Sequence, residues 1–171
     1  MPIVNGCVLP DELLYDVERQ VWYREIGDGL VEVGVTSVAV AMAGTIVAIT
    51  PKRAGRRLAA GNACAVFESG KFVGPAKVAF SAEIVRRNEG LMEQPSLAHT
   101  DPYGAAWLVV LRPDDWDSAK QLLTPGCNVA APYLELMQEA NFAGCNGGTD
   151  KAAGRPPAGQ PQGLVIDSPE C

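Results

Sequence analysis

The feature that most restricts the fold of this chain is a predicted β-hairpin with a lysine at its turn. An apolar run, Ala63–Phe67, enters the hairpin, and Phe72 with Val73 leaves it. We expect Gly70 to supply the backbone freedom that a tight two-residue turn requires. Lys71 should then stand at the tip, with its ammonium group clear of the protein surface. Taken alone, this pattern favours an ordinary solvated lysine, so its meaning depends on the rest of the chain.

The remaining pattern predicts a mainly β fold in which short strands alternate with turns. Strands are expected at residues 21–26, 30–35, 46–49, 62–67, 76–80, 83–87 and 107–111, and short helices at 38–43, 89–93, about 113–123 and 131–142. Residues 1–10 are expected to form an irregular arm, and the acids after Pro10 one helical turn. Residues 11–145 then form the folded domain with its C-terminal helix. Residues 146–171 are rich in Gly, Pro, Gln and Ala, and such a segment buries too little apolar surface to order itself.

Charge and length exclude several classes of function. The chain has 171 residues and a formal net charge of −6, which argues against nucleic acid and anionic membrane surfaces as partners. No apolar run approaches the roughly 20 residues of a membrane span. The first ten residues lack the basic and apolar regions of a signal peptide. We therefore expect a cytoplasmic protein, which works most simply as a monomer.

The cysteines and the single histidine show no metal-binding or catalytic spacing. The chain has five cysteines without a C-x-x-C pair (Cys7, Cys64, Cys127, Cys145 and Cys171). An odd number without a secretion signal indicates reduced thiols. His99 has no Cys or His neighbour in sequence, so a structural role for the thiols is favoured over a Cys–His nucleophilic pair. A phosphate-binding loop ending at Lys71 is also excluded, because Ala65 and Phe72 replace its first glycine and its hydroxyl residue.

The pattern of residues along the chain resembles that of a known family. From about Asp11 to Leu123 the sequence resembles the H protein of the glycine cleavage system and related lipoyl carriers. The matching residues are Val33-Gly34-Val35-Thr36, Gly44-Thr45-Ile46-Val47, Glu68-Ser69-Gly70-Lys71, Ser81, Glu83-Ile84-Val85, Asn88-Glu89, Pro95, Leu97, Asp101-Pro102-Tyr103-Gly104 and Trp107. The group from Asp101 to Trp107 is the most specific.

The resemblance implies a fold and a cofactor. The fold would be the barrel-sandwich hybrid of lipoyl domains, mainly β with short flanking helices. The cofactor would be lipoate in amide linkage to Lys71, and Glu68, Ser69, Gly70 and Phe72 would form the recognition site of the attaching enzyme. Such a protein is a covalent carrier and not a complete enzyme.

Departures from the family pattern bear on the pathway. H proteins usually have valine before the lysine and a small residue after it, whereas Gly70 and Phe72 stand here. Gln20 replaces a usual histidine, and Val73-Gly74-Pro75 replaces a more polar stretch. The run Ser69-Gly70-Lys71-Phe72-Val73-Gly74-Pro75 resembles the lipoate-binding proteins associated with a heterodisulfide-reductase-like complex of sulfur oxidation. Ala79 and Ala82 also replace the residues that usually bracket Ser81.

Two sets of partners therefore follow from the resemblance. In the sulfur pathway the lipoyl-lysine arm would carry sulfur-bound cargo or electrons to the heterodisulfide-reductase-like complex or to sulfur-transfer proteins. In glycine cleavage it would carry the aminomethyl group between glycine decarboxylase and aminomethyltransferase. A lipoate-attaching enzyme and dihydrolipoamide dehydrogenase belong to either set. An unmodified structural or regulatory barrel remains an alternative, and a biotin carrier is disfavoured because methionines do not flank Lys71.

Overall fold

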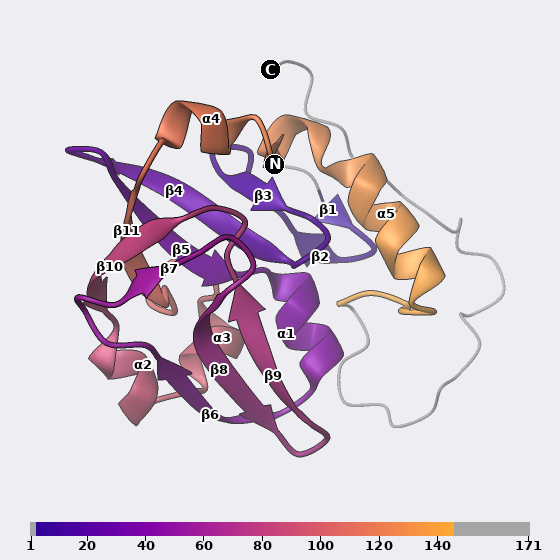
Figure 1. Ribbon diagram of the computed structural model, residues 1–171. Coiled ribbons are helices and arrows are strands. Elements are labelled where there is room, and N and C mark those ends of the chain that lie inside the picture. Colours follow the sequence, from indigo (N-terminus) through magenta and orange to yellow (C-terminus); the bar gives the residue numbers. More distant parts are fainter. Residues whose placement is uncertain (1–2, 146–171) are drawn as a thin grey trace, which may run out of the picture.

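The architecture consists of antiparallel sheets wrapped around one main core. The computed structural model describes residues 3–145 (Figure 1). A seven-stranded sheet has the order β12-β3-β4-β5-β11-β10-β7, a three-stranded sheet has the order β6-β8-β9, and β1 pairs with β2. The strands are β1 (Ile3–Val4), β2 (Cys7–Val8), β3 (Leu14–Asp16), β4 (Val21–Gly27), β5 (Leu30–Val35), β6 (Ile46–Pro51), β7 (Arg57–Leu58), β8 (Ala63–Ser69), β9 (Val73–Lys77), β10 (Ala82–Arg87), β11 (Val109–Pro113) and β12 (Thr124–Pro125). This arrangement confirms the mainly β, lipoyl-domain-like fold.

Short helices connect and flank the sheets. They are α1 (Ser37–Ala43), α2 (Glu89–Glu93), α3 (Leu97–Thr100), α4 (Trp116–Lys120), α5 (Ala130–Glu139) and the 3-10 helix η1 (Gly126–Asn128). Thr36 caps α1 by accepting a hydrogen bond from Ala39 N, and Gly44 ends that helix with a φ of 78°. Such a positive φ favours glycine. Among the described residues, no helix is both long and apolar enough to cross a membrane.

Two apolar clusters hold the sheets and helices together. The larger cluster lies between the two main sheets and includes Val33, Phe67 and Ile84. Val31, Val33 and Val35 of β5 are buried on one face of the strand, as expected for a strand that packs on a core. The smaller cluster joins the N-terminal hairpin to α5 through residues such as Val4, Tyr133 and Met137.

The family motif around Asp101 anchors residues of the smaller apolar cluster. The Trp22 indole N–H donates hydrogen bonds to the backbone oxygens of Val35 and Pro102, both at 3.1 Å. A side chain at Gly34 would overlap the Trp22 ring, so glycine is required there by close packing. Tyr103 hydroxyl donates to Val8 O at 2.6 Å and accepts from Ser37 N at 3.0 Å. The motif therefore fixes the start of α1 relative to the sheet.

Several expectations about the N-terminal region are wrong. Residues 1–10 were expected to be irregular, but β1 and β2 form a hairpin whose turn is Asn5-Gly6, with φ values of 48° and 79°. Asn-Gly is the preferred sequence for such a turn, so the hairpin follows from a local pattern. The residues after Pro10 form turns that lead into β3 and not a helical turn.

The expectation of reduced thiols is also wrong for Cys7, Cys127 and Cys145, which are all disulfide-bonded. Cys7 of β2 and Cys145 after α5 form a disulfide, with Cα atoms 4.9 Å apart. Residues separated by 138 positions are brought together there, which no spacing rule detects. Cys64 has a free thiol in the core, where burial raises its pKa to about 12. Such a thiol is not an effective nucleophile near neutral pH.

Other expected elements differ mainly at their ends. The strand expected at 76–80 lies at Val73–Lys77, and α3 was not anticipated. The helix expected at about 113–123 is confined to Trp116–Lys120, capped by Asp115. The C-terminal helix agrees closely, with Tyr133 and Met137 buried. The prediction for residues 146–171 concerns a segment outside the described residues.

Candidate functional site

The candidate site is the turn between β8 and β9, at the end of the three-stranded sheet. Glu68 pairs with Val73 across the two strands, and Ser69 N donates to Phe72 O at 2.9 Å. Gly70 and Lys71 are therefore the two central residues of a tight hairpin, as the sequence predicts. Lys71 is exposed.

The hydroxyl of Ser69 organises this turn. It accepts hydrogen bonds from Lys71 N at 3.2 Å and Phe72 N at 3.3 Å. Gly70 N donates to Thr45 O at 3.3 Å, which ties the turn to the segment before β6. Side chains of serine commonly stabilise turns through such local bonds. The backbone around Lys71 is thus held by the Ser69 hydroxyl within the turn and by Thr45 O from outside it.

The role expected for Gly70 is not the one observed. Gly70 is not among the glycines with a positive φ, and no atom lies within 4 Å of a Cβ built on it. The turn therefore has no steric need for glycine at this position. The tight turn depends instead on Ser69 and on the hydrogen bond to Thr45.

Lys71 also lies closer to the protein surface than expected. A Cβ placed on Gly44 would be 3.7 Å from Lys71 Cε and 3.8 Å from Nζ. The side chain thus leans over the end of α1, where the absence of a side chain on Gly44 leaves room for it. Sequence reasoning identified Gly44 only as the end of the helix.

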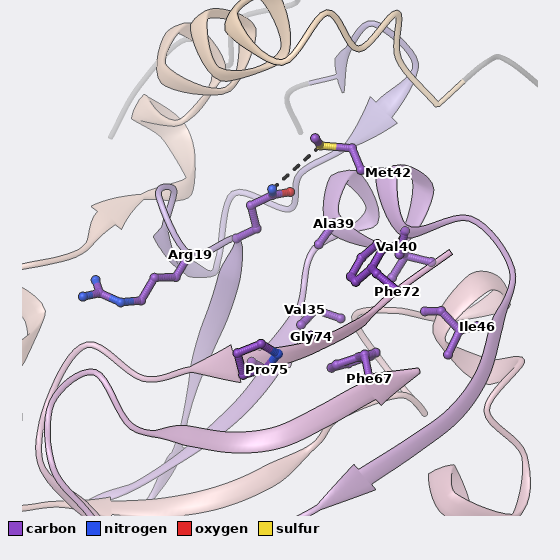
Figure 2. A pocket seen from close by; sticks show the side chains of 13 residues that line it. Arg19, Val35, Ala39, Val40, Met42, Ile46, Phe67, Phe72, Gly74 and Pro75 are labelled. Carbon is purple, nitrogen blue, oxygen red and sulfur yellow. Dashed lines mark hydrogen bonds between the residues drawn. The ribbon is translucent and has the colours of Figure 1, made fainter. Parts of the chain in front are cut away.

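An apolar pocket of about 300 Å³, lined in part by Phe72, lies next to the hairpin turn (Figure 2). One wall is α1, and the other is formed by Phe67 of β8 and by Phe72 with the start of β9. Phe72 is 48% exposed, and its ring lies 3.0 Å from a Cβ built on Gly74. The pocket is lined by Arg19, Gln20, Val35, Ala39, Val40, Met42, Ala43, Ile46, Phe67, Phe72, Gly74, Pro75 and Ala76.

The polar groups at the pocket come from the turn before β4. Gln20 has a φ of 60°, and its Nε2 donates to Met42 Sδ at 3.8 Å. Its Oε1 is buried and has no hydrogen-bond partner among the described residues. Arg19 is paired with Asp16 at 3.0 Å. Sequence reasoning noted Gln20 as a departure from the family but did not place it at this pocket.

His99 and Cys64 do not form a catalytic pair. His99 Nε2 accepts a hydrogen bond from Ile46 N at 3.2 Å and so supports the start of β6. Cys64 is fully buried within the main core. Neither residue lines the pocket next to the hairpin turn.

The fold and the site together define a class of protein. A flattened antiparallel barrel that presents a lysine at a hairpin turn is the architecture of carriers that bear a covalently attached cofactor. The site offers an exposed amine and an apolar pocket but no catalytic group among the residues that line them.

Comparison with known proteins identifies the family within this class. Residues 13–132 match the family model described as glycine cleavage H-protein. Glycine cleavage system H protein 5 of Aquifex aeolicus is 41% identical over 143 residues, which cover 81% of this chain and 96% of the relative. Probable glycine cleavage system H protein 2 of Sulfurisphaera tokodaii is 35% identical, covering 80% of this chain and 93% of the relative. The chain belongs to the glycine cleavage H-protein family.

A solved structure supports the same conclusion. The crystal structure of a glycine cleavage system H protein from Mycobacterium marinum superimposes with a TM-score of 0.57 at 34% identity, covering 61% of this chain and 86% of that one. Proteins of this family carry lipoate on a lysine and work with partner enzymes. The chain is accordingly a lipoyl carrier and not a catalyst.

Proposed function

We propose that Lys71 carries the lipoyl group and that the resulting arm serves a sulfur-oxidising, heterodisulfide-reductase-like system. Three observations support Lys71 as the attachment site. It occupies a two-residue turn fixed by Ser69, its side chain is exposed, and an apolar pocket adjoins the turn. Glu68, Ser69, Gly70 and Phe72 surround it and would form the surface that the attaching enzyme recognises.

The residues around Lys71 fit such a group. When attached, lipoate supplies a cyclic disulfide that is more readily opened than a relaxed one. Val40, Phe67 and Phe72 offer apolar surface for its hydrocarbon chain. Met42 and the aromatic rings add polarizable contacts that suit sulfur.

The residues that line the pocket support sulfur cargo over the aminomethyl group. Its lining residues include Arg19 and Gln20 but no carboxylate, and Arg19 is neutralised by Asp16. The aminomethyl cargo of glycine cleavage contains an amine, which a site with a carboxylate would bind better. The apolar lining and Met42 instead suit the sulfur atoms of the arm and of a sulfur-bound cargo.

Phe72 supports the same choice through recognition of partners. Its half-exposed ring stands directly after the lysine, where H proteins usually have a small residue. A docking cleft shaped for a small residue clashes with this ring. Val73, 66% exposed, continues the apolar surface.

Glycine cleavage is the second candidate, favoured by the names of the relatives. The test supplies the lipoylated protein to glycine decarboxylase and follows glycine-dependent exchange of labelled bicarbonate. We expect exchange far below that of an authentic H protein, together with turnover by the sulfur-oxidising complex. Exchange comparable to the authentic carrier would refute the sulfur assignment.

A gain-of-function variant sharpens this test. Gly70→Val with Phe72→Ala restores the usual residues on both sides of Lys71, and Gly70 has room for a side chain. If partner discrimination depends on these residues, the double variant should gain exchange activity. Lys71→Ala should lose lipoylation while Lys77→Ala retains it, as measured by intact mass and peptide mapping. An adduct on Lys77 or Lys52 would refute the attachment site.

A further inference from the structure

A basic groove opens on the three-stranded sheet, away from the apolar pocket. Its volume is about 410 Å³. We use the term basic groove for the hollow formed chiefly by Lys52, Arg53, Arg56, Arg87, Val66 and Met92. It combines four cations with two exposed apolar side chains, in a protein whose formal net charge is −6.

Only the folded structure assembles this groove. Lys52, Arg53 and Arg56 belong to the loop after β6, which the sequence shows as one basic stretch. Arg87 belongs to β10 and Met92 to α2. The groove includes them because α2 packs beside β6 (Figure 1). By contrast, the neighbouring Arg57 is engaged by Asp114 at 2.6 Å.

The cations of the basic groove are largely available to a partner. Among the described residues, no ion pair engages Lys52, Arg53 or Arg56. Arg87 has a long contact with Glu89, at 3.5 Å. Free arginines beside exposed apolar groups are typical of protein interfaces, where arginine is enriched.

The exposed face of β8 leads from the basic groove toward the hairpin turn. Val66 lines the groove and pairs with Thr50, while Glu68, two residues further along β8, pairs with Val73. Residues two apart on a strand share a face. A continuous exposed strip therefore runs from the groove, past Glu68 and Val73, to Lys71.

The distance along this strip matches the size of a protein interface. At about 3.3 Å per residue, the loop cations lie roughly 15–20 Å from the hairpin turn. A standard interface buries about 800 Å² on each partner, which corresponds to a disc of roughly 16 Å radius. An enzyme that encloses Lys71 would thus meet the basic groove at its rim.

We propose that the basic groove docks an acidic surface of the lipoate–protein ligase that modifies Lys71. This inference rests on the proposed attachment of lipoate to Lys71. Glu68 lies between the turn and the groove and would repel acidic residues of the partner. The acidic residues of the partner are therefore expected to face the groove and not the strip. Charges at an interface rim act mainly on association rate and its salt dependence.

The test measures steady-state lipoylation of the full-length protein by lipoate–protein ligase. Arg53→Glu with Arg56→Glu reverses two groove cations. Arg86→Glu with Arg112→Glu changes net charge equally, at exposed positions outside the groove. We expect the groove variant to raise KM at least about fivefold at low ionic strength with kcat within about twofold, and the control variant to leave both within about twofold. In about 0.5 M salt the difference should disappear, because screening acts over a few ångströms.

The outcomes separate this inference from the proposed function. Equal changes of KM in the two variants, or none in either, would overturn the docking site while Lys71 is still lipoylated. Saturable binding of inorganic phosphate that depends on Arg53 and Arg56 and leaves KM unchanged would indicate a small-anion site and overturn it too. An adduct absent from Lys71 in the wild type would instead refute the proposed function.

Discussion

Loss of the Cys7–Cys145 disulfide should remove a large part of the stability of this protein. The bond joins β2 to the segment after α5, across a sequence separation of 138 residues. Closing so long a loop in the unfolded chain corresponds to about 5 kcal/mol at 25 °C in the chain-entropy model. Because the net stability of a domain is only about 5–15 kcal/mol, this contribution is a substantial fraction.

Cys145→Ser is the suitable perturbation. Cys7 is fully buried, so replacing it would also alter the smaller apolar cluster, whereas Cys145 is only partly buried. The hydrogen bond from Cys145 N to Asn5 O remains in the variant. We expect the melting temperature to fall by about 10–20 °C, given roughly 2–4 °C per kcal/mol for a chain of this length.

The assay is urea unfolding of wild type and variant, each with and without dithiothreitol. In oxidising buffer the two free energies of unfolding should differ by about 5 kcal/mol. In reducing buffer they should agree within about 1 kcal/mol, because both then lack the bond. Equal stabilities in oxidising buffer would refute the reasoning, and a difference that persists in reducing buffer would assign the loss to the serine itself.

Three further predictions test local features of the fold. Gly34→Ala should lower the free energy of unfolding by about 3 kcal/mol in the same assay, because the new methyl group overlaps Trp22; a neutral effect would contradict the packing. Gly70→Ala should change it by less than about 0.5 kcal/mol, since φ is not positive and the space is open. Lys120 lowers the pKa of Glu25, so Glu25→Gln should cost less than about 1 kcal/mol at pH 7. The difference in free energy of unfolding between wild type and variant should vanish as pH falls through the lowered folded-state pKa of Glu25. A difference that grows at acidic pH would contradict this prediction.

Local sequence determined the elements that depend on neighbouring residues. The hairpin at Lys71 and the capped helices after Thr36 and Asn88 could be predicted because turns and caps are satisfied within a few residues. The family motif at Asp101 could be recognised, but its role as an anchor for Trp22 could not. That role depends on a hydrogen bond between residues 80 positions apart.

Tertiary structure decided the features that combine distant segments. The pocket next to the hairpin turn needs α1, β9 and the turn at Gln20 together, and the basic groove adds Arg87 to a loop that precedes it by many residues. The disulfide joins β2 to the segment after α5. Sequence patterns report local backbone preference and which face of an element is buried. Which buried faces and which side chains meet is set by packing over the whole chain, and so it emerges only in the folded protein.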